Sequence, residues 1–209
     1  GYPWFSDWGR DTMIALPGLA IETGRVDLAG RILAAFAAAR SDGLIPNRFA
    51  EETGHADYNT VDASLWFLQA ASAFLREGGD ADLVRERLWP AVVDVVERYR
   101  DGTQFGIGTD TDGLVTAGSP RTQLTWMDAQ VEGHPVTPRF GKAVEINALW
   151  VSGLALVAEL AEDLDLTPPS PPADHETLKA RFLDTFWNEA TGCLFDCVYP
   201  DGGRDGAIR

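Results

Sequence analysis

The chain has 209 residues, 45% of them hydrophobic, which is enough for one globular domain with a sizeable core or for part of a larger one. Its net charge of -15 comes with no cluster of basic residues, so a nucleic-acid partner is not expected. No apolar run reaches the length of a membrane span, and the two cysteines, Cys193 and Cys197, suggest neither a disulfide framework nor a zinc site. We therefore expect a cytoplasmic protein that needs no membrane, metal or cofactor.

Hydrophobic periodicity and helix-end signals predict six helices. The first begins at the capping residue Asp11 and ends at Gly24, with a kink expected at Pro17. The others are expected at residues 26–40, 61–76, 81–100, 142–162 and 175–187. Between them, hairpins or turns are expected at residues 109–115 and 193–203, and a proline-rich connector at 166–175.

The predicted helices alternate between two burial patterns. The second, fourth and sixth are amphipathic, as helices with one solvated face must be, whereas the first, third and fifth are apolar on nearly every side. This pattern predicts an all-α protein in which inner helices, surrounded by protein, alternate with outer helices. Six helices in this order would form about half of a double-layered ring of twelve, and a simple helical bundle is the alternative.

The loops before the three predicted inner helices are rich in aromatic and polar residues. They read PWFSDWGRD, HADYNTVD and RTQLTWMDAQVEGHPVTPRFGK. If the inner helices run parallel, these loops meet at one rim. Such a rim suits a neutral sugar, because aromatic rings pack against its C–H faces while Asp, Asn and Arg bind its hydroxyls. Two carboxyl groups there could also cleave a glycosidic bond.

Four motifs in this order resemble the C-terminal amylo-α-1,6-glucosidase domain of glycogen debranching enzymes, within the six-hairpin glycosidase superfamily. They are WFSDWGRDTMIALPGL (4–19), YNTVDASLWF (58–67), TQLTWMDAQ (122–130) and GKAVEINALW (141–150). The more distant glucoamylases resemble the first and third. The resemblance implies an (α/α)6 toroid, of which residues 1–209 would supply about the first half. We expect the C-terminal half of this catalytic domain to belong to the remainder of a longer parent chain.

The resemblance also implies catalytic roles. In TWMDA, Asp128 matches the general acid of the family, and Trp126 matches an aromatic residue beside the same subsite. Desolvation by Trp126 and Met127 would raise the pKa of Asp128 as an acid requires, and a solvated loop aspartate is the alternative. The general base of the family lies late in the domain. We therefore expect it beyond Arg209 and assign no residue to it.

The first motif implies contacts with the terminal glucose. Arg10 and Asp11 in WGRDT fall where the family holds the sugar hydroxyls, and Trp8 lies beside them. Asp11 has a second interpretation, because an aspartate in this position can also cap the first helix. The two roles are compatible with each other.

The second and fourth motifs imply further substrate contacts. Asn59 and Asp62 in YNTVD are expected either to bind the sugar or to cap the following helix. Lys142 and Glu145 lie about one helical turn apart in GKAVEIN. Glu145 is therefore expected either to contact the sugar directly or to form an ion pair with Lys142 that orients the rim.

The reaction implied by the resemblance is inverting hydrolysis of α-1,6-linked glucose at the branch points of glycogen or starch. The partner would be an α-glucan. A glucoamylase-like or trehalase-like enzyme and a non-catalytic carbohydrate-binding domain are the alternatives. Residues 1–209 alone are expected to bind sugar poorly and to hydrolyse it hardly at all, because half a ring leaves the site open.

Overall fold

The computed structural model describes residues 7–49 and 56–209, so Trp4, Phe5 and His55 of the predicted loops lie outside it. All six predicted helices are present. The α-helices are α1 (Gly9–Leu16), α2 (Val26–Ala38), α3 (Ala63–Arg76), α4 (Ala81–Leu83), α5 (Trp89–Asp101), α6 (Val144–Asp163) and α7 (His175–Phe186). Short π-helical turns span Pro17–Ile21 and Val84–Leu88, and a 3₁₀ turn spans Gln104–Gly106.

Two predicted helices are interrupted. The first starts at Gly9 rather than Asp11, and it continues beyond Leu16 as the π-helical turn that begins at Pro17. The fourth is divided into α4, a second π-helical turn and α5, and Pro90 lies in the first turn of α5. Proline has no N–H group, so the regular hydrogen-bond ladder is interrupted near each proline.

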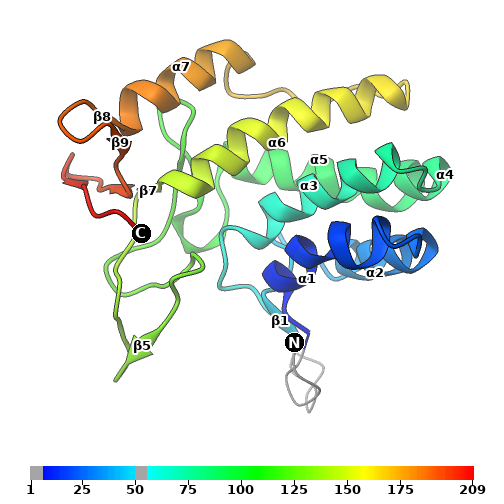
Figure 1. The fold of residues 1–209 in the computed structure, drawn as a ribbon, viewed down its shortest axis with the longest axis horizontal. Helices are drawn as coiled ribbons and strands as arrows, with labels where there is room; N and C mark the ends of the chain where they lie inside the picture. The colour runs from blue at the N-terminus through cyan, green and yellow to red at the C-terminus, as the bar shows by residue number, and fades with distance from the viewer. Residues whose placement is uncertain (1–6, 50–55) are drawn as a thin grey trace.

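The helices form two layers. Helix α3 packs against both α1 and α6, and these three inner helices start at the same end of the molecule (Figure 1). Helices α2, α5 and α7 run back beside them and place their amphipathic faces on α3 and α6. The prediction that the inner helices run parallel and share one rim is therefore confirmed for the described residues.

The core lies between the two layers and contains the largest fully buried side chains. Tyr99 of α5 stacks on Trp150 of α6, with ring centroids 6.0 Å apart. Both polar atoms of this pair are satisfied, because the Tyr99 hydroxyl donates to the carbonyl of Val61 at 2.8 Å and the Trp150 indole donates to the carbonyl of Gly113 at 3.1 Å. Side chains from an outer and an inner helix thus anchor the segments that lead to the rim.

The burial predicted for the inner helices is wrong for α1 and the turn that follows it. The side chains of Ile14 and Leu19 are 47% and 70% exposed. The expectation that no segment is long and apolar enough to span a membrane is wrong for α6, which has that length and composition. Half of that stretch is buried inside the protein, where α6 contacts α3 and α7. We interpret α6 as a core helix, because the buried core helices of other proteins can be equally long and apolar.

The rim carries short antiparallel strands that join its loops. β1 (Arg48–Phe49) pairs with β2 (Ala56–Asp57), β3 (Gly108–Thr109) with β4 (Val115–Thr116), β5 (Gln130–Val131) with β6 (His134–Pro135), and β8 (Trp187–Asn188) with β9 (Cys193–Leu194). A three-stranded sheet has the order β11 (Arg204–Asp205), β10 (Cys197–Val198) and β7 (Lys142–Ala143). Only the hairpin material near 109–115 and 193–203 was predicted, because two-residue strands carry no periodicity.

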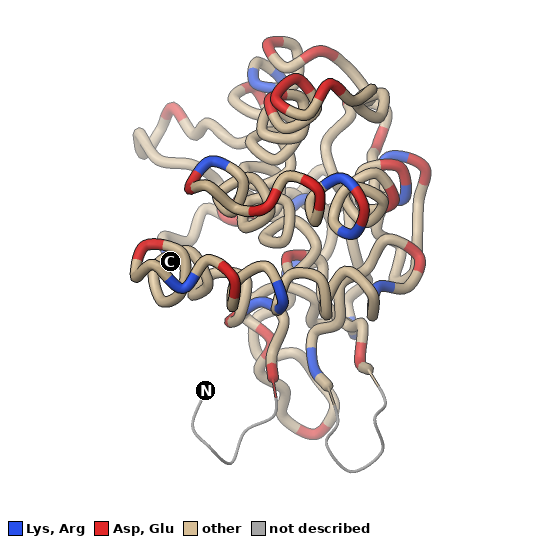
Figure 2. Tube along the Cα trace, turned by 90° about the vertical axis from the view of Figure 1, so that its right-hand side faces the viewer, with Lys and Arg blue, Asp and Glu red and all other residues tan. Residues whose placement is uncertain are grey.

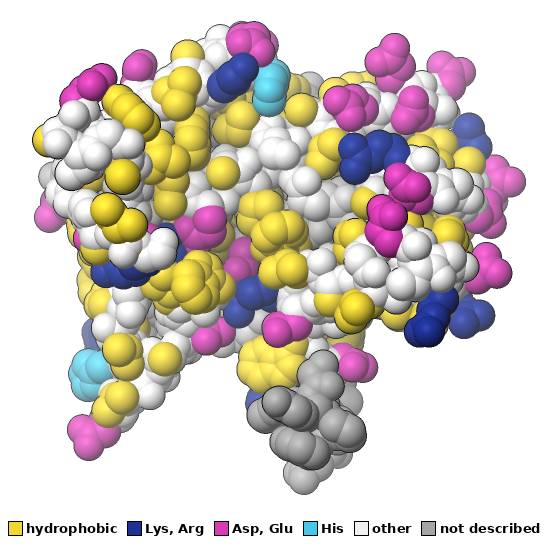
Figure 3. Space-filling model, viewed as in Figure 1, with side chains coloured by type: hydrophobic (Ala, Val, Ile, Leu, Met, Phe, Trp, Pro, Cys, Tyr) yellow, Lys and Arg dark blue, Asp and Glu magenta, His cyan; other side chains and the backbone are white. Residues whose placement is uncertain are grey.

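Charged side chains mark the end of the molecule opposite the rim. Acidic groups crowd that end in the space-filling view, on its right-hand side (Figure 3). The view that faces this end shows basic and acidic segments interleaved along the helices (Figure 2). This mixture is typical of a solvated surface.

Candidate active site

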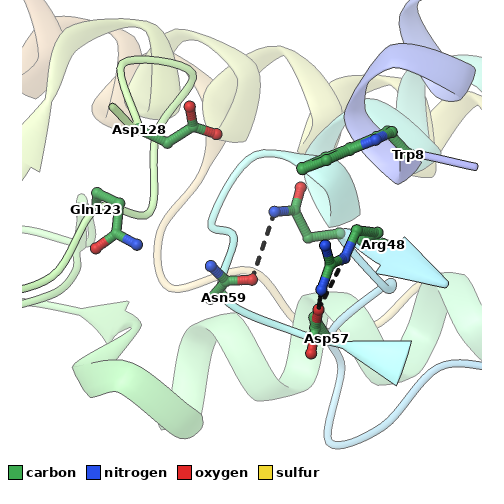
Figure 4. Close-up of a pocket in the computed structure, with 7 residues that line it drawn as sticks. Trp8, Arg48, Asp57, Asn59, Gln123 and Asp128 are labelled. Carbon is green, nitrogen blue, oxygen red and sulfur yellow. Dashed lines mark hydrogen bonds and ion pairs between the residues drawn. The ribbon is translucent and has the colours of Figure 1, made fainter. Parts of the chain in front are cut away.

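A pocket of about 280 Å³ opens at the rim where α1 and α3 begin (Figure 4). Its lining comes from the segments before the three inner helices and from the β1–β2 hairpin. The lining residues are Trp8, Asn47, Arg48, Asp57, Asn59, Gln123 and Asp128. The structure thus brings together three residues that the sequence analysis singled out, Trp8, Asn59 and Asp128.

Close backbone packing fixes the position of Trp8. The N–H of Gly9 donates to the carbonyl of Asn47 at 2.9 Å, and a Cβ at Gly9 would lie 2.0 Å from the carbonyl oxygen of Pro46. Only glycine therefore fits at the start of α1. Beside it, the Arg48 guanidinium lies over the Trp8 ring, 5.8 Å from the centroid, and is held by Asp57 at 2.7 Å. The ring thus has a defined orientation at the pocket.

A buried arginine joins the loops of all three inner helices. Arg10, in the first turn of α1, donates from Nε to Asp62 at 2.6 Å and from Nη1 to Asp128 at 3.1 Å. Asp62 precedes α3 and also accepts a hydrogen bond from the Thr60 hydroxyl at 2.6 Å. Burial, the largest effect, raises the pKa of Asp62, although the charge of Arg10 acts in the opposite direction.

Two buried polar atoms near the pocket have no hydrogen-bond partner among the described residues. They are Nη2 of Arg10, which is a donor, and Oδ1 of Asn47, which is an acceptor. The amide of Asn47 donates weakly to Asn59 at 3.4 Å. Buried polar groups in native proteins are nearly always paired. Asn47 lines the pocket, so a ligand hydroxyl there would donate to its Oδ1, whereas Arg10 is not part of the lining.

Several predicted site residues lie outside the pocket lining. Arg10 and Asp62 lie outside the lining as partners of each other, and the Asp62 side chain does not cap α3. Asp11 is exposed in the first turn of α1, whose N-cap is Trp8, so it does not cap that helix. The predicted desolvation of Asp128 is wrong for the described structure, because its side chain is 39% exposed and Trp126 is 55% exposed. The loop turns the Trp126 ring toward solvent instead of packing it against the carboxyl group.

The predicted partners of Glu145 are also corrected. Both Glu145 oxygens accept hydrogen bonds from the buried guanidinium of Arg139, at 2.5 Å each. Lys142 instead binds Asp110 at 3.0 Å and Asp112 at 2.6 Å. Lys142 lies in β7 rather than in α6, so the predicted helical spacing between it and Glu145 does not apply.

Four lining residues were not predicted from the sequence: Asn47, Arg48, Asp57 and Gln123. A signal for Asn47 and Arg48 was available, because two polar residues interrupt the apolar stretch between Ile45 and Phe49. Asp57 becomes recognisable only once β1 and β2 pair, since the register places it opposite Arg48. Among the residues that the structure describes, no group of three or more His, Cys, Asp or Glu side chains could hold a metal ion.

Comparisons with known proteins show relatives at the level of sequence. A family model described as amylo-alpha-1,6-glucosidase matches residues 1–209. A glycogen debranching enzyme of Saccharomyces cerevisiae is 30% identical over 207 residues, which covers 73% of this chain and 13% of that enzyme.

Solved structures of two rhamnosidases have a similar fold. The GH78 family rhamnosidase of Bacillus sp. GL1 matches with a TM-score of 0.64 at 16% identity, over 100% of this chain and 20% of that protein. The rhamnosidase from Klebsiella oxytoca with rhamnose bound matches with a TM-score of 0.60 at 21% identity, over 95% of this chain and 36% of that protein. These structures have an (α/α)6-type glycosidase fold, and at such identities the likeness concerns the fold alone.

Proposed function

Because this chain belongs to the amylo-α-1,6-glucosidase family, a family of glycoside hydrolases, we propose that the full-length protein removes α-1,6-linked glucose at the branch points of glycogen or starch. The observation that carries this proposal is the pocket, where Trp8, Asn59 and Asp128 from three separate loops converge. An acidic, aromatic pocket suits a neutral α-glucan. The chain spans only 13% of the yeast relative, so the activity is proposed for the whole protein.

In this proposal the pocket holds one glucose unit. The Trp8 ring offers an apolar surface to the sugar C–H groups, and the unpartnered oxygen of Asn47, which lines the pocket, binds a hydroxyl. Pairing this buried oxygen supplies binding free energy, because it otherwise remains desolvated without a hydrogen bond. Asp11 and Trp126, which lie outside the lining, would contact only parts of the substrate that extend beyond the pocket.

Asp128 would act as the general acid. Its carboxyl group would protonate the leaving glycosidic oxygen while a second carboxylate activates water on the opposite face of the sugar, as inversion requires. The guanidinium of Arg10 donates to the Asp128 carboxyl group at 3.1 Å and orients it at the pocket. Asp57 and Asp62 are each held by an arginine, and neither is assigned as the base.

We also propose that the two layers belong to an (α/α)6 toroid and that residues 1–209 supply about half of it. The fold of the two rhamnosidases supports this arrangement. The exposed apolar side chains of Ile14 and Leu19 support it too, because further inner helices would cover them.

The test compares glucose release by the full-length protein from isomaltose-type, maltose-type and trehalose substrates. We expect preferential cleavage of the α-1,6 linkage, with β-glucose as the first product in a proton NMR time course, since inversion changes the anomer. Rapid trehalose cleavage without α-1,6 cleavage would contradict the linkage. Binding without hydrolysis of any α-glucoside would favour a carbohydrate-binding domain.

A matched pair of variants tests the acid. Asp128→Asn should lower kcat by roughly 100-fold or more, the usual contribution of a general acid. Asp94→Asn is the control, because Asp94 on the outer helix α5 also pairs with an arginine, Arg40, at 3.1 Å, but away from the pocket. Unchanged hydrolysis by Asp128→Asn would refute the assignment.

A further inference from the structure

Arg139 is buried outside the pocket lining and is surrounded by carboxylates. Its two terminal nitrogens bind both oxygens of Glu145, in the first turn of α6. Its Nε binds Asp196 at 2.9 Å, and Nη2 binds the second oxygen of that carboxylate at 3.0 Å. Arg209 also pairs with Asp196, which adds a second positive charge to the cluster. The guanidinium therefore joins the start of α6 to the segment before β10.

A further contact of Arg139 leads toward the proposed acid. Nη1 donates to the hydroxyl oxygen of Thr125 at 3.2 Å, and the N–H of Met127 donates to the same oxygen at 3.4 Å. Thr125 is buried. One residue earlier, the carbonyl of Leu124 accepts a hydrogen bond from the N–H of Val61 at 2.9 Å. The loop is thus held at two successive residues, and Asp128 follows three residues after Thr125.

We infer that Arg139, oriented by Glu145, is a positioning residue that fixes the loop of Asp128 through the Thr125 hydroxyl. This inference rests on the proposed function and deepens it. It assigns Glu145 to the support of the loop, in place of the sugar contact or the ion pair with Lys142 that the sequence left open.

Physical considerations favour a geometric role for the cluster. Buried ion pairs add little net stability compared with well-packed apolar residues, because desolvation offsets the attraction between the charges. A planar guanidinium with five donors can instead hold several acceptors in one fixed arrangement. Here it holds two carboxylates and a hydroxyl at once. Displacing a general acid by about 1 Å can lower a rate by about 100-fold, so such support has a kinetic consequence.

The decisive variant is Thr125→Val in the full-length protein. It removes the hydroxyl with little change of side-chain shape, and the ion pairs of Arg139 with Glu145 and Asp196 stay in place. We expect kcat on an α-1,6-linked glucoside to fall about tenfold with KM within about twofold, because ground-state contacts in the pocket are kept. Thr125→Ser, which restores the hydroxyl, should recover kcat to within about threefold of wild type.

Thr109→Val is the matched control. The hydroxyl of Thr109 donates to the carbonyl of Arg100 at 2.9 Å, at the end of the outer helix α5, so its loss removes a comparable hydrogen bond without touching the loop of Asp128. Its kcat should stay within about twofold of wild type. A loss of kcat equal to that of Thr125→Val would overturn the inference.

Amide hydrogen exchange gives a second readout that needs no activity. Thr125→Val and Arg139→Lys should speed exchange at Met127 by about tenfold, because the N–H of Met127 donates to the Thr125 hydroxyl that Arg139 holds. Unchanged exchange in both variants, or full kcat in Thr125→Val, would overturn the positioning role of Arg139. If the wild type still hydrolyses the α-1,6-linked glucoside, the proposed function stands in either case. Absence of hydrolysis by the wild type would instead refute the proposed function, and exchange would still decide whether Arg139 holds the loop.

Discussion

Replacing Arg10 with methionine tests the buried charges that join the three rim loops. The side chain of Asp62 is 3% exposed and has Arg10 at 2.6 Å, so the variant leaves this carboxylate buried without its counter-charge. Removing one partner of a buried ion pair costs about 3–5 kcal/mol. Since 1 kcal/mol shifts the Tm of a domain of this size by about 2–4 °C, we expect Tm to fall by roughly 6–20 °C.

The loss of stability should depend on pH. Burial already raises the pKa of Asp62 in the folded protein, and the loss of Arg10 raises it further. A carboxyl group whose pKa is higher in the folded state than in the unfolded state favours folding while it is protonated, and this contribution is lost as the pH rises through the folded pKa. The deficit of Arg10→Met should therefore be small near the ordinary aspartate pKa of about 4 and large at about pH 8.

Urea denaturation followed by circular dichroism at about pH 4, 6 and 8 measures this effect. The double variant Arg10→Met/Asp62→Asn should recover much of the stability at high pH, because it removes the unpaired charge. Asp128→Asn is the comparison, and since the Asp128 side chain is 39% exposed its ion pair should be worth only about 0–1 kcal/mol. A deficit of Arg10→Met below about 1 kcal/mol at pH 8, or one that does not change with pH, would refute the reasoning.

Three further predictions concern single side chains. Gly9→Ala should destabilise the protein by about 1–3 kcal/mol in urea denaturation, since the added Cβ would lie 2.0 Å from the carbonyl oxygen of Pro46. Gly18→Ala is the control, because its Cβ meets nothing within 4 Å. Equal losses of stability in the two variants would count against the steric argument. Asn47→Ala should raise KM for the α-glucoside about tenfold in steady-state kinetics, because it removes the buried side-chain oxygen proposed to bind a sugar hydroxyl. An unchanged KM would exclude that contact. Tyr99→Phe should cost about 1–3 kcal/mol in urea denaturation, because a buried carbonyl before α3 loses its donor at 2.8 Å; a fully stable variant would contradict this.

Much of the helical architecture could be predicted from the sequence. The apolar periodicity of segments such as residues 61–76 and 142–162 located α3 and α6 to within two residues at each end. Helices can be predicted in this way because their hydrogen bonds and their apolar faces repeat over a few neighbouring residues. The alternation of burial patterns likewise indicated two layers, and the motif-bearing loops indicated a shared rim.

Other features could not be predicted locally. The exposure of Ile14 depends on which other segments surround α1, and the residues of α1 alone do not indicate this. The β1–β2 pairing that places Asp57 opposite Arg48 joins strands of two residues each, too short to show a period.

The sequence by itself determined where the helices form, which loops carry the polar and aromatic side chains, and the resemblance that the family comparison confirmed. Only the tertiary structure decided which charges meet. Arg10 and Asp128 are 118 residues apart, and Glu145 binds Arg139 rather than Lys142 because the chain bends into β7 just before α6. The type of a charged side chain determines which kinds of group it can bind. The packing of distant segments then decides which of several chemically equivalent groups becomes its partner.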